Sequence, residues 1–222
     1  MKANAQHYTN VVNRPLIIGD DDTLLIDKIN IPGLHVMTGN TAKLLAEMEK
    51  TFPDQEEGKN FVDKFLATMN VHRAEYQGSH SFEGNQARKL LRRIALLRPA
   101  AEKLPAGLRE KVLQFIETME AFNEVVVACF GMFIEGDHVK AIKHYSKLYR
   151  SLGISIPPKV HVVEAHLATF LARKNTPGFG LAAWTEQAFE SCHHDFKVEW
   201  EKFSVSPDHP EYEQRLLEAV IR

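Results

Sequence analysis

Residues 106–130 place apolar side chains at the spacing of a long amphipathic helix. Pro105 ends the helical pattern that precedes this run, and Gly131 and Gly136 flank the end of the run itself. An apolar stripe of this length indicates a helix that packs into a core. The stripe consists of Leu108, Val112, Phe115, Ile116, Met119, Phe122, Val126 and Phe130.

The segment before this helix carries a second clear helical pattern. Its apolar residues recur at i, i+3, i+4 and i+7, and its other face is rich in arginine. Asn85 is the expected N-cap, and residues 76–85 before the helix read as a loop because they are rich in glycine and serine. The apolar residues are Ala87, Leu90, Leu91, Ile94 and Leu97.

Further helices are predicted towards both ends of the chain. Residues 34–48 predict a helix that is either continuous or broken near Gly39 and Asn40. Asp137 is the expected cap of a helix that Gly153 closes. Pro157 and Pro158 begin another helix. The fold class is therefore mainly α. We expect a single, mostly helical domain over 1–222, in which 1–33 is an irregular or short-strand entry and 34–222 is helical.

Composition narrows the cellular setting. The two cysteines, Cys129 and Cys192, lie in apolar helical patterns and are expected to be buried free thiols in a reducing compartment. No run of 18 apolar residues and no secretory leader occurs, so an intracellular protein, nuclear or cytoplasmic, without a membrane span is expected. The last helical pattern reaches Arg222 without a stop signal, which suggests a piece of a longer protein.

Positive charge gathers in one part of a chain whose net charge is only −2. Residues 81–115 hold eight lysines and arginines against three glutamates, a local charge of +5. Such a patch can hold nucleic-acid phosphates, or it can be the solvated face of a helix. The candidate phosphate-binding residues are Arg88, Lys89, Arg92 and Arg93.

A helical segment from Trp184 to Phe196 combines an apolar stripe with titratable residues along one edge. Glu186, Glu190 and His193 lie on or near that edge, and His194 follows, so a metal or catalytic site is one interpretation. A solvated helix edge with i,i+4 pairs is the other interpretation. His161 and His166 lie elsewhere and are five residues apart, which does not place both on one face of an α-helix, so the H-E-x-x-H zinc pattern is absent.

Four segments together resemble a set of transposon-encoded proteins of invertebrate genomes. They are Ile31–Gly39 (IPGLHVMTG), Glu75–Leu91 (EYQGSHSFEGNQARKLL), Pro157–His166 (PPKVHVVEAH) and Trp184–Phe196 (WTEQAFESCHHDF). These proteins look like DNA transposases with an RNase H-like catalytic core of the DDE type. The resemblance covers almost the whole chain, from about Tyr8 onward.

The resemblance implies a fold and a site. The chain would hold the helical insertion and the final helix of an RNase H-like core, while the two catalytic aspartates and a Cys-rich segment would lie upstream of Met1. Glu186-Gln187-Ala188-Phe189 is similar to the E-R-x-F box around the last acid of hAT-type transposases. Glu186 is then the first candidate for the third metal-binding acid, and Glu190 the second.

One carboxylate cannot run two-metal phosphoryl chemistry, so the resemblance implies no autonomous catalysis. No tightly bound cofactor is expected, and Mg²⁺ is expected only in a full-length context. The partners implied are DNA, a second copy of the chain, or a transposase core. Two alternatives stay open: a metal-dependent hydrolase that uses Glu186, Glu190, His193 and His194, and a helical protein-interaction module without metal or DNA.

Overall fold

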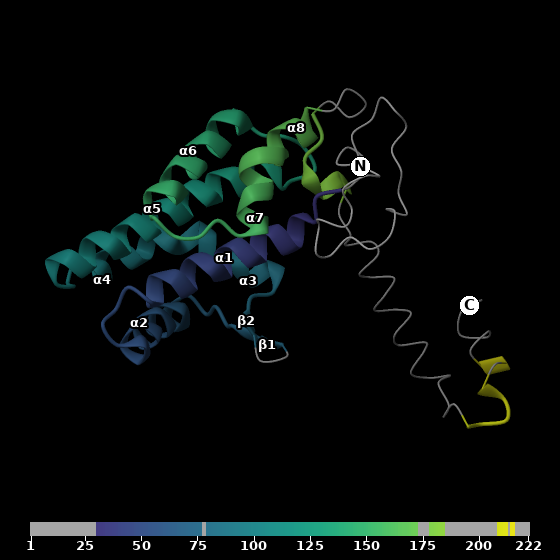
Figure 1. Ribbon diagram of the computed structural model, residues 1–222, viewed down its shortest axis with the longest axis horizontal. Coiled ribbons are helices and arrows are strands. Elements are labelled where there is room, and N and C mark those ends of the chain that lie inside the picture. The colour runs from purple at the N-terminus through teal and green to yellow at the C-terminus, as the bar shows by residue number, and fades with distance from the viewer. Residues whose placement is uncertain (1–29, 77–78, 173–177, 185–207, 213, 216–222) are drawn as a thin grey trace, which may run out of the picture. The chain divides into compact units, whose positions relative to one another are not determined.

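The computed structural model describes residues 30–76, 79–172, 178–184, 208–212 and 214–215 (Figure 1). This part of the chain is mainly helical, as the sequence predicted. Its core lies in the unit Ile31–Arg222. Among the described helices, none combines the length and the apolar character that crossing a membrane would require.

The elements follow one another along the chain with short connections. In order they are α1 (Gly33–Glu49), α2 (Gln55–Thr68), β1 (Ala74–Tyr76), β2 (Ser79–Ser81), α3 (Gly84–Arg93), η3 (Ile94–Leu97), α4 (Arg98–Ala101), α5 (Ala106–Cys129), α6 (His138–Ser151), α7 (Pro158–His161), η4 (Val162–His166), α8 (Leu167–Leu171) and η5 (Leu181–Trp184).

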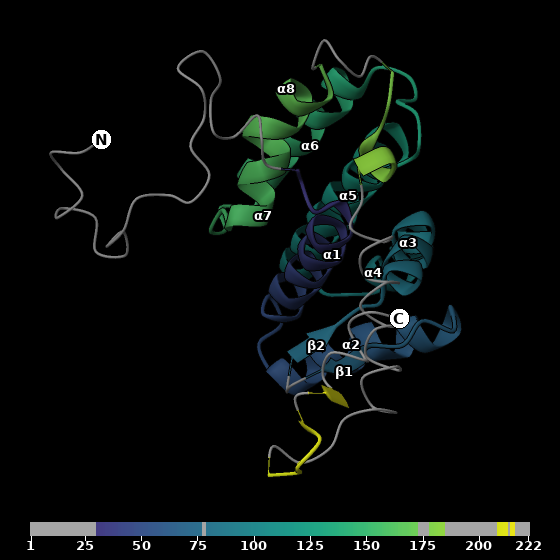
Figure 2. The ribbon, with the colours of Figure 1, turned by 90° about the vertical axis from the view of Figure 1, so that its right-hand side faces the viewer.

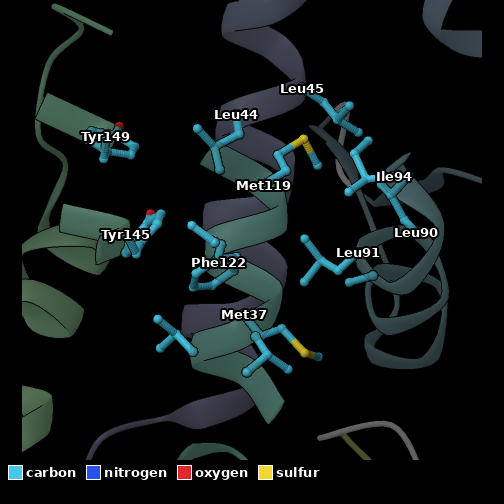
Figure 3. Packing of buried hydrophobic residues seen from close by; sticks show 14 of the residues in the cluster. Met37, Leu44, Leu45, Leu90, Leu91, Ile94, Met119, Phe122, Tyr145 and Tyr149 are labelled. Carbon is cyan, nitrogen blue, oxygen red and sulfur yellow. The ribbon is translucent and has the colours of Figure 1, made fainter. Parts of the chain in front are cut away.

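Helix α5 is the centre of the packing, and it contacts α1, α3, α4 and α6 (Figures 1 and 2). Figure 3 shows α1 and α5 between two outer groups of side chains. Tyr145 and Tyr149 of α6 lie on one side, and Leu90 and Leu91 of α3 lie on the other. The apolar stripe predicted for residues 106–130 is buried except at its first residue, Leu108, which is partly buried. The fold therefore buries one long helix on several sides at once.

Of the two possibilities for the first helix, the continuous one holds, because α1 runs without interruption through Gly39 and Asn40. Both residues instead lie where α7 packs against α1. The Asn40 side chain is buried, and its amide Nδ2 donates to the carbonyl of Lys159 at 3.4 Å. A Cβ at Gly39 would lie 2.4 Å from Cδ of Lys159. Gly39 and Asn40, which in the sequence resemble a helix-breaking pair, are thus residues of the contact between α1 and α7.

The predicted loop over residues 76–85 is wrong in part. β1 and β2 pair as an antiparallel hairpin, with Ala74 opposite Ser81 and Tyr76 opposite Ser79. The helix that follows begins at Gly84, one residue before the predicted cap Asn85. Its N-cap residue is Glu83, which makes no side-chain capping hydrogen bond.

Helix α6 confirms both of its predicted ends. The carboxylate of Asp137 accepts a hydrogen bond from the backbone N–H of Lys140 at 2.9 Å. Gly153 follows the helix with φ of +66°, a left-handed conformation that glycine adopts without the steric cost of a side chain. These two residues fix the length of α6 and hence the position of its buried tyrosines.

The two buried tyrosines of α6 should respond differently to loss of their hydroxyls. Tyr149 Oη donates to the carbonyl of Ser155 at 3.0 Å, whereas Tyr145 Oη has no hydrogen-bond partner among the described residues. Burial raises the pKa of Tyr145 well above its usual range, so its phenol stays protonated. We expect Tyr149→Phe to lower the free energy of unfolding by about 0.5–1.5 kcal/mol and Tyr145→Phe to leave it unchanged or raise it. Urea denaturation measures both, and an equal loss in Tyr145→Phe would show that its hydroxyl has a partner.

Candidate nucleic-acid interface

The basic face predicted from the sequence lies on α3. Ala87, Leu90 and Leu91 bury one side of this helix against α1 and α5, so the other side faces solvent. Arg92 and Arg93 are exposed there, in the last turn of the helix. Positive charge in a last turn also complements the helix dipole, which is a purely structural benefit.

Lys89 belongs to the same surface but is partly committed to the fold. Its ammonium Nζ donates to the backbone carbonyl of Asn70, just after α2, at 2.7 Å. The side chain is half-buried, yet this hydrogen bond lies at the surface. Because an ammonium has three donors, Lys89 can hold Asn70 and a phosphate together.

Arg88 differs from the other three predicted residues. Its Nη2 donates to the backbone carbonyl of Phe130 at 3.1 Å, which joins α3 to the end of α5. Burial first, and the charge of Arg92 second, lower the pKa of the Arg88 guanidinium below its ordinary value. Arg88 is therefore a positioning residue of the fold rather than part of the exposed face.

The exposed face is not neutralised by acids within the described part of the chain. Other arginines of that part do have carboxylate partners: Arg73 pairs with Glu49, Arg98 with Glu120 and Arg150 with Glu164. No described carboxylate pairs in this way with Arg92 or Arg93, whose nearest sequence neighbours are apolar or basic. We use the term α3 basic face for Lys89, Arg92 and Arg93.

A small cavity lies at the start of α3 and is lined in part by Arg88. Its volume is about 180 Å³, well below the roughly 300–1,000 Å³ of typical small-molecule sites. Glu83 and Arg88 contribute opposite charges, and much of the remaining wall is apolar. The lining residues are Gly33, Leu34, Met37, Glu83, Gly84, Asn85, Arg88, Phe130, Leu181 and Ala182. At this volume the cavity is too small to be a typical substrate site.

The predicted acid-rich site lies outside the described residues. Glu186, Glu190, His193 and His194 all fall within 185–207, so their roles stay predictions. In the ranges that are described, no three His, Cys, Asp or Glu side chains gather as metal ligands would.

Cys129 is a buried free thiol, as predicted, and burial raises its pKa to about 12. A thiol with so high a pKa is not a nucleophile at neutral pH.

One histidine pair was missed by the sequence analysis. The expectation that His161 and His166 lie on different faces is wrong, because η4 is a π-helical turn. The backbone N–H of Leu167 donates to the carbonyl of Val162, five residues back, and the two imidazole centroids lie 5.1 Å apart. Apart from the histidine spacing itself, no sequence signal marks such a turn.

Compared with known proteins, the chain matches no family model, no curated protein and no solved structure. The resemblance to transposon-encoded proteins therefore depends on the four sequence segments alone. Three of these segments meet around α1: Ile31–Gly39 forms its first half, Glu75–Leu91 contacts it through β2 and α3, and Pro157–His166 contacts it through α7. The resemblance in these three segments therefore corresponds to the packing around α1 as much as to a functional site.

Proposed function

We propose that the chain is a transposase-derived protein that binds the nucleic-acid backbone through the α3 basic face. The observation that carries this proposal is the exposure of Arg92 and Arg93 without a described carboxylate partner, beside Lys89. The four motifs that resemble transposon-encoded proteins support it independently. An RNase H-like core and a role for Glu186 remain part of the proposal and not of the described fold.

The chemistry of this face favours phosphates over bases. Lysine and arginine side chains on one exposed helix face bind phosphate oxygens by charge, and this contact carries no sequence information directly. Binding should release counterions, so affinity should fall as salt rises. We therefore expect similar affinity for duplexes of unrelated sequence.

Fluorescence anisotropy with a labelled DNA duplex over a series of salt concentrations tests the proposal. The double variant Arg92→Gln plus Arg93→Gln should bind more weakly at every salt concentration. The slope of log K against log salt should become shallower by about two, because each arginine that no longer neutralises a phosphate reduces the slope by roughly one. Thermal melting of the same variant checks that the fold is intact.

A charge-matched control separates the α3 basic face from net charge. Lys140→Gln plus Lys143→Gln removes the same charge from exposed positions of α6. This control should keep the affinity and the salt slope of the unchanged protein. Equal behaviour of the two double variants, or no salt-dependent binding at all, would contradict the proposal and leave Arg92 and Arg93 as solvated residues at a helix end.

A further inference from the structure

The helix over residues 158–171 contains an irregularity that brings two histidines together. α7, η4 and α8 follow one another without a gap, and η4 adds one residue to a single turn. In a regular α-helix, residues five apart lie roughly 140° from each other around the axis. The extra residue of the π-turn moves His166 to the position that an i+4 residue would occupy. π-Turns of this kind are often found at functional sites.

The two imidazoles lie at a separation that one metal ion can bridge. With Zn–N bonds of about 2.0–2.1 Å, two imidazoles that share one ion have ring centroids roughly 4.5–5.2 Å apart. The centroids of His161 and His166 are 5.1 Å apart. The rings stand at 86° to each other, and rotation about the χ2 angles would turn one nitrogen of each ring towards a shared ion. The χ2 torsion of histidine is soft, so this rotation costs little.

The surroundings leave both rings available. His161 is exposed and His166 is half-buried, so an ion can reach them from solvent. The nearest acid in sequence, Glu164, accepts a hydrogen bond from Nε of Arg150 and is therefore engaged elsewhere. No hydrogen bond from another described residue occupies the ring nitrogens of either histidine. A carboxylate-free pair of imidazoles selects against Mg²⁺ and Ca²⁺, which require oxygen ligands.

We propose that His161 and His166 form a two-imidazole clip for a divalent transition-metal ion such as Cu²⁺, Ni²⁺ or Zn²⁺. Imidazole nitrogen suits these ions, and affinity should be greatest for Cu²⁺. Water, or a group from a partner molecule, completes the coordination. The clip shares no residue with the α3 basic face or with the predicted cluster at Glu186, His193 and His194.

Calorimetric titration of the full chain with Ni²⁺ and Cu²⁺ tests the clip. Because the chain has other histidines, all proteins should carry His193→Ala plus His194→Ala, which removes the predicted cluster as a source of binding. In this background, His161→Ala and His166→Ala should each weaken the binding by about tenfold or more. The second ligand of a chelate binds at high effective concentration, so losing either one removes most of the affinity.

His72→Ala is the matched control. His72 is exposed and its Nε2 lies 3.0 Å from Oδ1 of Asn70, so it is a single surface imidazole without a second histidine partner among the described residues. Its variant should bind both ions as the background protein does. Thermal melts with and without Ni²⁺ give a second measurement, because an ion that binds the folded state raises the melting temperature. If His161→Ala and His166→Ala keep the affinity and the metal-induced shift of the background protein, the clip does not exist and the pair is only an edge-to-face ring contact.

Discussion

Phe122→Ala should lower the free energy of unfolding by about 3–5 kcal/mol, the range for truncation of a large buried aromatic. Phe122 is fully buried on α5, in the middle of the core that Figure 3 shows. Its ring lies 4.9 Å from that of Tyr145 on α6 and 6.4 Å from that of Phe130 at the end of α5. Truncation would leave a cavity between α5 and α6, where the ring of Phe122 packs on that of Tyr145. Urea denaturation monitored by circular dichroism measures the loss.

Phe133→Ala provides the comparison for the same chemical change at the surface. Phe133 is 62% exposed, and its ring contacts that of Phe179 at 5.6 Å. We expect the free energy of unfolding to fall by less than about 1 kcal/mol, because the Phe133 side chain buries little apolar surface when the protein folds. If the two variants lost similar stability, the contact between α5 and α6 could not be the centre of the core.

Periodicity predicted most of the helical fold because it records which side of each helix is buried. The stripe from Val112 to Phe130 and the pattern around Leu90 both correspond to buried faces. Sequence patterns failed where a neighbour far along the chain decides the local structure. Asn40 looks like a helix breaker until Lys159, on another helix, accepts its hydrogen bond. The residues that neighbour Asn40 in the sequence do not show that Lys159 is its partner.

The candidate site shows the same limit at the level of single side chains. Arg88 and Arg92 are one helical turn apart, and both belong to the predicted basic face. Only the fold separates them, because the carbonyl of Phe130 lies within reach of Arg88 while Arg92 faces solvent. The histidine clip was invisible for a related reason. Its two members share a face only because the backbone adds a residue at η4.

Gly58→Ala should destabilise the protein by about 1–3 kcal/mol, as overpacking of a close contact does. Gly58 is buried on α2, where that helix approaches the end of α1. A Cβ at this position would lie 2.3 Å from the carbonyl oxygen of Glu49 and 3.1 Å from its carbonyl carbon. Both atoms belong to the backbone, so no side chain can rotate away and α2 itself must shift. This cost should exceed the gain of about 0.4–1 kcal/mol that alanine brings where a glycine site accommodates it without strain.

Gly107→Ala isolates that gain in the same protein. Gly107 lies in the first turn of α5 and is exposed, and a Cβ there meets no atom within 4 Å. We expect it to raise the free energy of unfolding by about 0.4–1 kcal/mol, because alanine restricts the unfolded chain. The two substitutions are chemically identical and should therefore change stability in opposite directions. A stabilising Gly58→Ala would mean that α1 and α2 do not approach each other at Glu49, and that the helical unit packs differently at this end.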